Sequence, residues 1–215
     1  MIKNTRNIAT IVTAAAVLSA AAPAASAFAG GWANAQGGYK ADEKQLTVRL
    51  EGGSSHNYGI SSYAFMDLDA VKPGADLENV YAEGRIMKSL DFILPGLKAM
   101  VEVDVGNSMR DFVRYGASLT PDLGNGNFTQ FRWCPATSQE GVGSQVTIYT
   151  SQEILPGLTA SMLVDYNLRP NTIYVEPRID LKLTEQVAGF FMGRGFGEVN
   201  GRIDVKPVVG LQYNL

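Results

Sequence analysis

The residues that could most readily take part in a reaction lie around the only histidine of the sequence. His56 follows Ser54 and Ser55 in the stretch EGGSSHN. An imidazole beside a hydroxyl can act as the base that activates a serine nucleophile, as hydrolases and acyltransferases require. The stretch is rich in Gly, Ser and Asn, so we interpret it as a turn between two strands. His56 is the only candidate base, and we place it in a turn, so we expect that the protein is not an enzyme.

The cysteine content excludes two further kinds of chemistry. Cys134 is the only cysteine, so no intrachain disulfide can form. One Cys and one His do not supply the set of ligands that a zinc site needs, so we expect no metal and no cofactor. Cys134 lies beside Trp133 and Pro135 at the end of an alternating segment, and we interpret it as a packing residue of a wall.

The first residues have the pattern of an export signal. A start with two basic residues precedes an uncharged apolar run over 8–22, and Ala-Ser-Ala at 25–27 fits the small-x-small cleavage pattern. A membrane anchor is the alternative, but the run is short and is interrupted by Thr and Ser. We predict a cleaved signal peptide at 1–27 and one domain at 28–215.

The charge balance argues against nucleic acid as a partner. The chain has 18 Lys and Arg against 21 Asp and Glu, and it contains no long basic run. After the leader, no stretch approaches the ~20 apolar residues of a membrane helix.

The elements that must position these residues are strands. Apolar and polar residues alternate with a period of two, which is typical of a strand with two different faces, and turn-forming clusters separate the segments. The predicted strands are QLTVRLE (45–51), YGISSYAFMDLD (58–69), NVYAEGRIMKSL (79–90), LKAMVEVDV (97–105), DFVRYGASLT (111–120), NFTQFRWC (127–134), SQVTIYTSQEI (144–154), LTASMLVDYN (158–167), NTIYVEPRIDLKL (171–183), QVAGFFMGRGF (186–196) and RIDVKPVVGLQYNL (202–215).

Two architectures would produce this alternation. In 97–105, Val101 and Val103 share one face while Glu102 and Asp104 share the other. A soluble sandwich turns the apolar face to its core, whereas a transmembrane barrel turns it to lipid and the charged face to an aqueous lumen. The barrel is favoured because strands of ~9–11 residues can cross a bilayer and the apolar face carries almost no charge. Aromatic residues near segment ends fit an interfacial girdle: Tyr58, Trp133, Tyr166 and Tyr213.

A repeated turn sets the strand count. The sequence ILPGL occurs at 93–97 and again at 154–158, and Pro-Gly is a tight-turn signature. Four strands separate the two copies, so both lie at the same end of an antiparallel barrel, which we assign to the periplasm together with Leu215. Counting back from the first copy, strand 45–51 would start at the outer end of the barrel. One more strand must therefore bring the chain up from the periplasm, and Gly30–Lys40 is the candidate. We predict an all-β, transmembrane, antiparallel up-and-down β-barrel of twelve strands, with ten as the alternative.

The polar face defines the candidate site. It carries eleven acids and nine bases, interspersed with aromatic residues. Charges that form hydrogen bonds, together with aromatic faces, suit a neutral polar solute with a flat ring. For any one residue, bracing of the wall is the alternative role. The candidate lumen-lining residues are Tyr63, Phe65, Glu83, Arg85, Glu102, Arg114, Arg132, Tyr149, Tyr174, Glu176, Arg178 and Arg194.

The order of these segments resembles that of the nucleoside-specific channel-forming outer-membrane porins (Tsx-like). The similar stretches are YGISSYAFMDLD, NVYAEGRI, FVRYGASLT, NFTQFRW, GSQVTIYTSQEI, IYVEPRIDLKL and VKPVVGLQYNL. The resemblance implies a twelve-stranded barrel that passes nucleosides or similar small solutes. The chain differs from the family in its shorter length, its brief outer loops and its final Leu215.

These observations predict an outer-membrane channel for passive diffusion of small polar solutes, with nucleosides as candidates and outer-membrane lipid as the surroundings. A structural barrel with an occluded lumen is the alternative, and the oligomeric state is left open. We further expect that Val103→Arg impairs insertion and that Glu102→Gln is tolerated and alters only conduction.

Overall fold

The computed structural model describes residues 31–40, 43, 45–71, 77–107, 111–124, 126–138 and 143–215. The predicted signal peptide lies outside the described residues. Within the described part of the chain, no helix is long and apolar enough to cross a membrane.

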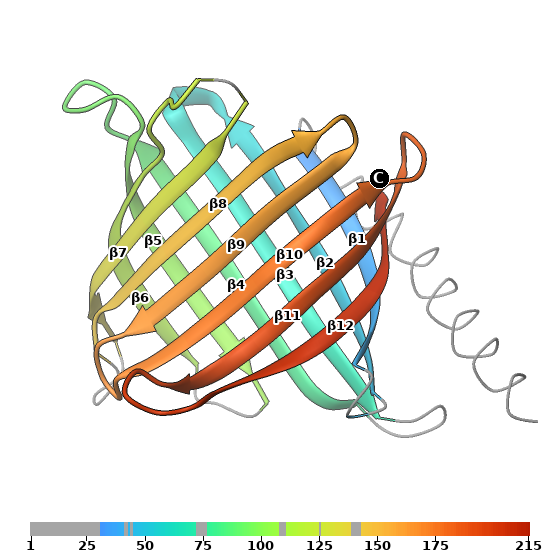
Figure 1. Ribbon diagram of the computed structural model, residues 1–215. Helices are drawn as coiled ribbons and strands as arrows, with labels where there is room; N and C mark the ends of the chain where they lie inside the picture. Colours follow the sequence, from blue (N-terminus) through green and yellow to red (C-terminus); the bar gives the residue numbers. More distant parts are fainter. Residues whose placement is uncertain are drawn as a thin grey trace, which may run out of the picture.

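Twelve strands form one closed antiparallel barrel, in which each strand pairs with its neighbours in sequence and β1 pairs with β12 (Figure 1). The prediction of a twelve-stranded, all-β barrel is confirmed. The strands are β1 (Gly31–Lys40), β2 (Gln45–His56), β3 (Ile60–Val71), β4 (Leu77–Ser89), β5 (Leu97–Gly106), β6 (Phe112–Leu119), β7 (Phe128–Thr137), β8 (Gln145–Leu155), β9 (Leu158–Asn167), β10 (Thr172–Lys182), β11 (Val187–Glu198) and β12 (Ile203–Asn214).

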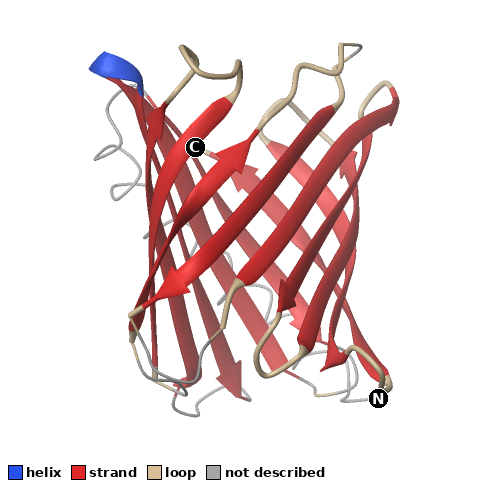
Figure 2. Ribbon diagram, turned by 90° about the vertical axis from the view of Figure 1, so that its left-hand side faces the viewer, coloured by secondary structure: helices blue, strands red, loops and turns tan. Residues whose placement is uncertain are grey.

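The two ends of the barrel are distinguished by the connections that they carry. We call the end at the top of Figure 1, where β12 ends, the upper end. It carries the connections β2–β3, β4–β5, β6–β7, β8–β9 and β10–β11, whereas the lower end carries the others. Figure 2 shows the short 3-10 helix η1 (Asn57–Gly59), which is the β2–β3 connection, at the upper end.

The two ILPGL copies lie at the same end, as predicted, but they form different turns. In the second copy, Pro156 and Gly157 alone connect β8 to β9, and Leu155 pairs with Leu158. In the first, Pro95-Gly96 closes a longer connection. Both glycines have positive φ, +79° at Gly96 and +78° at Gly157, which is why the same dipeptide occurs twice.

The stretch EGGSSHN is not a turn, contrary to the prediction. Strand β2 continues to His56, and the reversal takes place at η1. Gly52 has a packing role in β2, because a Cβ there would lie 2.9 Å from the carbonyl oxygen of Trp32 on β1. The glycine therefore allows close approach of two strands, a role that glycine plays in strands as well as in turns.

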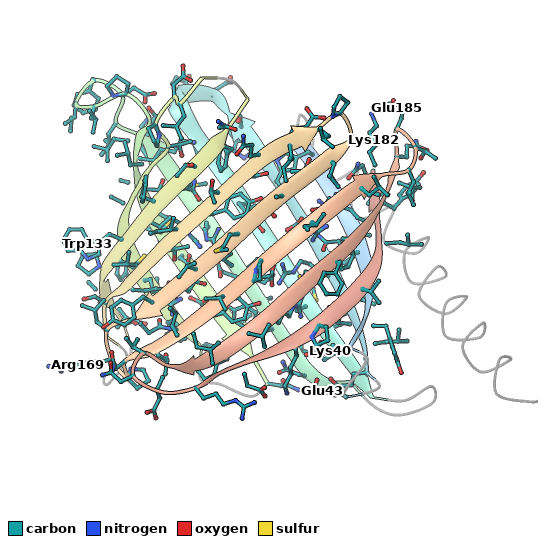
Figure 3. All side chains as sticks on the ribbon, viewed as in Figure 1. Lys40, Glu43, Trp133, Arg169, Lys182 and Glu185 are labelled. Carbon is teal, nitrogen blue, oxygen red and sulfur yellow. The ribbon has the colours of Figure 1, made fainter. Side chains whose placement is uncertain are left out.

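The two faces of the wall follow the predicted alternation. On β5, Val101 and Val103 are 41% and 42% exposed on the outer surface, whereas Glu102 and Asp104 are 1% and 0% exposed inside. Trp133 projects away from the wall on the outside (Figure 3). The outer surface is therefore apolar and the interior polar, which is the reverse of a soluble sandwich and the arrangement of a transmembrane barrel.

Candidate functional site in the barrel lumen

The interior holds a cavity of about 980 Å³, lined by side chains from eleven of the twelve strands. Its lining includes seven Lys or Arg and seven Asp or Glu residues. A polar, charged interior of this size inside a closed wall can hold water and small solutes. Because the two signs balance, the lining gives little net preference for an anion or a cation.

The structure places eleven of the twelve candidate residues on the wall of this cavity, and Glu102 lies behind them. The eleven are Tyr63, Phe65, Glu83, Arg85, Arg114, Arg132, Tyr149, Tyr174, Glu176, Arg178 and Arg194. Glu102 is 1% exposed, so it cannot meet a solute directly. Trp32, on the glycine-rich strand β1, also lines the cavity and was missed by the sequence reasoning. The alternation of Trp32, Asn34 and Gln36 would have identified it.

Glu102 is the centre of an ion-pair network on β4 to β7. The members of this Glu102 cluster are Glu83, Arg85, Glu102, Asp104, Arg114 and Arg132. The Nε of Arg85 lies 2.7 Å from one carboxylate oxygen of Glu102, and Nη1 of Arg132 lies 3.0 Å from the same oxygen. Nη1 of Arg114 lies 2.8 Å from the other oxygen. Three guanidinium groups therefore share one buried carboxylate.

The arginines of the Glu102 cluster also pair with acids other than Glu102. Arg85 pairs with Glu83, and Arg114 lies 2.7 Å from Asp104. Arg132 also reaches toward Asp165 on β9, at 3.7 Å. Charge-assisted bonds of this kind fix side-chain positions, so the cluster shapes the wall of the lumen on this side.

A second network reaches across the interior. The members of this cross-lumen cluster are Arg49, Asp67, Glu176 and Arg194. Arg49 on β2 binds Asp67 on β3 through two hydrogen bonds of 2.7 and 2.8 Å, and it contacts Glu176 on β10 at 3.2 Å. Arg194 on β11 contacts Glu176 at 3.4 Å and Asp67 at 3.5 Å. Because β1 and β12 separate β2 from β11, these pairs bridge strands that are not neighbours in the sheet.

Small apolar clusters also lie on the inner face of the barrel. Met87, Met100 and Cys134 pack together, with Tyr63 against them, so Cys134 is a buried packing residue as interpreted from the sequence. On the β11–β12 side, Phe190 belongs to a similar buried cluster with Met192 and Val208. These apolar clusters occupy part of the interior, so the open lumen is narrower than the barrel itself.

Several inward aromatic rings already have a cationic partner. The guanidinium carbon of Arg49 lies 4.8 Å from the centre of the Phe65 ring, and that of Arg85 lies 5.0 Å from the Tyr63 ring. Arginines likewise cover Phe112 and Phe190 at 4.4 Å. Cation–π contacts hold both groups in place, so these ring faces are less available to a solute than the sequence suggested.

The Ser–His pair lies on the outside of the barrel. Oγ of Ser54 is 2.8 Å from Nε2 of His56, and Oγ of Ser62 on β3 is 3.0 Å from the same nitrogen. These residues occupy the outward parity of β2 and β3, opposite to Arg49 and Tyr63. Among the described residues, no carboxylate binds the imidazole to orient it as a catalytic base.

The comparisons with known proteins give the fold. No family model matches the chain, and no curated protein matches it. Among solved structures, the chain is similar to KdgM porin, with a TM-score of 0.60, 12% identity, and coverage of 86% of this chain and 99% of the other. It is also similar to NanC porin, with a TM-score of 0.56, 13% identity, and coverage of 85% and 100%. The chain therefore has the twelve-stranded barrel fold of these porins.

Proposed function

We propose that this chain is an outer-membrane channel for the passive diffusion of small polar solutes. The observation that carries the proposal is the cavity of about 980 Å³ with a charged lining, inside a closed barrel whose outer surface is apolar. Such a barrel buries its backbone hydrogen bonds in the wall and turns its polar side chains to water. The shared fold with two porins supports the same role.

The balance of charge in the lining supports a neutral or zwitterionic solute. One of the similar structures is KdgM porin in complex with oligogalacturonate. A polyanion of that kind is favoured by an excess of basic side chains, whereas here seven bases face seven acids. Nucleosides remain the named candidates, because they are neutral, carry hydroxyl groups and have a flat ring that can lie against aromatic side chains.

Orientation and export are part of the proposal. We place the upper end, with the two-residue turn at Pro156 and Gly157, in the periplasm, because bacterial outer-membrane barrels keep short turns there. We also infer that residues 1–27 are removed on export. The intact mass of the protein recovered from outer membranes would test this, since the proposed product begins at Phe28.

Conductance in planar bilayers tests the channel. The purified protein should give discrete current steps, and added nucleoside should partly block them. Steps without block would retain the channel and reject nucleosides, and liposome swelling with sugars, amino acids and nucleosides would then compare solutes. Folded, inserted protein that gives neither current nor swelling would reject the channel in favour of a structural barrel with an occluded lumen.

A further inference from the structure

One corner of the outer surface is polar. Among the strand residues whose side chains the structure describes, Lys88 on β4 is the only Lys, Arg, Asp or Glu on the outward face. It lies at the upper end, where Ile60 is its partner on β3, and its ammonium group donates to the carbonyl oxygen of Tyr58. Ser62 and His56 lie on the same outward face nearby. A cation and hydroxyl donors therefore gather at one level of an otherwise apolar surface.

The connection beside this corner presents apolar side chains to the outside. Phe92 is 85% exposed, Ile93 63% and Leu94 46%. Tyr58, in the adjacent connection, is 87% exposed. A soluble surface seldom exposes three consecutive large apolar residues at a tip without a partner. In Figure 1 the β4–β5 connection, drawn in green, extends sideways beyond the barrel wall.

This tip is held in one shape by its own hydrogen bonds. The backbone N–H of Gly96 donates to the Asp91 carboxylate at 2.8 Å, and the N–H of Ile93 donates to the Leu90 carbonyl at 2.8 Å. The hydroxyl of Ser89 and the Gly96 amide hold the pKa of Asp91 below its usual value. The carboxylate of Asp91, the only acid of the connection, therefore stays ionised and is held by hydrogen bonds within the tip.

We propose that this corner, made of His56, Tyr58, Ser62, Lys88 and the tip 92–94, binds the headgroups of anionic phospholipids while the tip inserts among the acyl chains. A phosphate of the headgroup would accept hydrogen bonds from the Lys88 ammonium and the outward hydroxyls. The apolar tip would recover the free energy of burial that it lacks in water.

Lipid is the occupant that the surroundings favour. The corner is continuous with the apolar outer surface, where Ile86 on β4 is 64% exposed directly next to Ser62 in the pairing of β3 with β4. A cation just above such an apolar band lies at the depth of headgroup phosphates, where lysine side chains are drawn toward anionic lipid. The inference requires that the barrel be inserted in a membrane, but it does not require solute transport.

Tryptophan quenching by brominated lipids tests the proposal. Trp32 and Trp133 are replaced by Phe, and Phe92→Trp supplies the only tryptophan in the full chain. In vesicles, brominated phosphatidylglycerol should quench this tryptophan more than brominated phosphatidylcholine at the same mole fraction. One lysine near an anionic surface corresponds to about a fivefold preference for the anionic lipid. Lys88→Gln should bring the ratio of the two lipids close to one.

Two matched variants serve as controls. Lys98→Gln changes a lysine that faces inward and bonds Ser61, and it should leave the lipid preference unchanged. Leu123→Trp, in place of Phe92→Trp, reports on an exposed apolar residue of another upper-end connection, which lacks an outward lysine. Its tryptophan should show no preference for phosphatidylglycerol.

The outcomes separate the proposal from its alternatives. A tryptophan at 92 that iodide quenches in water, and that brominated lipids do not, would overturn the proposal and leave the tip as a surface for a protein. Equal quenching by both lipids would overturn the headgroup site. Co-flotation with vesicles and the far-UV β-sheet signal establish insertion for every variant, so a failure of conductance would not be confused with a failure of lipid binding.

Discussion

Glu102→Gln is the substitution that examines the interior network most directly. The change keeps the size of the side chain but removes its charge and replaces one acceptor oxygen with an NH₂ donor. One oxygen of Glu102 accepts from Arg85 and Arg132, and the other accepts from Arg114. Whichever way the new amide is placed, its NH₂ group faces at least one guanidinium donor.

The size of the effect follows from burial and from the number of bonds. Glu102 is 1% exposed, and its three partners have side chains that are 5–11% exposed. A hydrogen bond to a charged group contributes about 1.5–3 kcal/mol, and removal of one partner from a buried ion pair costs about 3–5 kcal/mol. We expect a loss of about 3 kcal/mol, toward the lower limit, because lumen water can solvate the arginines after they move. The expectation of tolerance drawn from the sequence is therefore revised.

Urea unfolding of the refolded barrel measures this loss. The midpoint should fall by about 1 M or more, since urea slopes are about 1–3 kcal/mol per molar. The control is Glu185→Gln, because Glu185 pairs with Lys182 at 2.8 Å but its side chain is 91% exposed, and such surface pairs contribute about 0–1 kcal/mol. The two labelled residues lie at the rim in Figure 3. Equal midpoints for the two variants would refute a buried, three-arginine network.

Three further substitutions follow from the wall, its turns and the cross-lumen cluster. Val103→Arg places a charge on the lipid face and should destabilise the inserted barrel by about 2–4 kcal/mol, whereas Val103→Leu should not, as unfolding from vesicles will show. Gly96→Ala should cost more than Gly157→Ala, because its Cβ would lie 2.2 Å from the carbonyl oxygen of Thr120; equal losses in urea would contradict this reasoning. Arg49→Gln should raise single-channel conductance by breaking the pairs that cross the lumen, and unchanged current would argue that these pairs do not limit flow.

The sequence was sufficient for the strands because their two faces meet different solvents. A strand such as β5 must alternate when one side meets lipid and the other water, so the pattern appears residue by residue. The turn predictions were wrong where glycine lets two strands approach each other and does not reverse the chain. Gly52 of EGGSSHN allows close pairing of β1 with β2, and the glycines of this stretch do not reverse the chain. The first ILPGL copy gave the position of a turn but not its length, because Leu90 and Leu97 close a larger loop.

The candidate site was predictable as a face but not as a set of contacts. Parity placed Arg49 and Glu176 inside, but their pairing depends on the closure and diameter of the barrel, which no local pattern contains. The same is true of Glu102, whose neighbours on β4, β6 and β7 cover it. The alternation of residues along a strand also cannot show that the Arg85 guanidinium lies over the ring of Tyr63, because that contact depends on side-chain rotamers.

The pairing of β1 with β12 has a consequence for biogenesis. Arg49 cannot meet Glu176 until the first and last strands have joined, since only that junction brings β2 near β10. Before this moment, Arg49 can pair only with Asp67 and Glu176 only with Arg194, and the charged face of the open sheet is not enclosed, so hydrocarbon would reject it. Maturation must therefore gather the whole chain before it commits to the membrane, or rely on machinery that shields the unfinished edges. The ion pairs inside the lumen therefore stabilise the closed barrel relative to a partly assembled chain in the membrane.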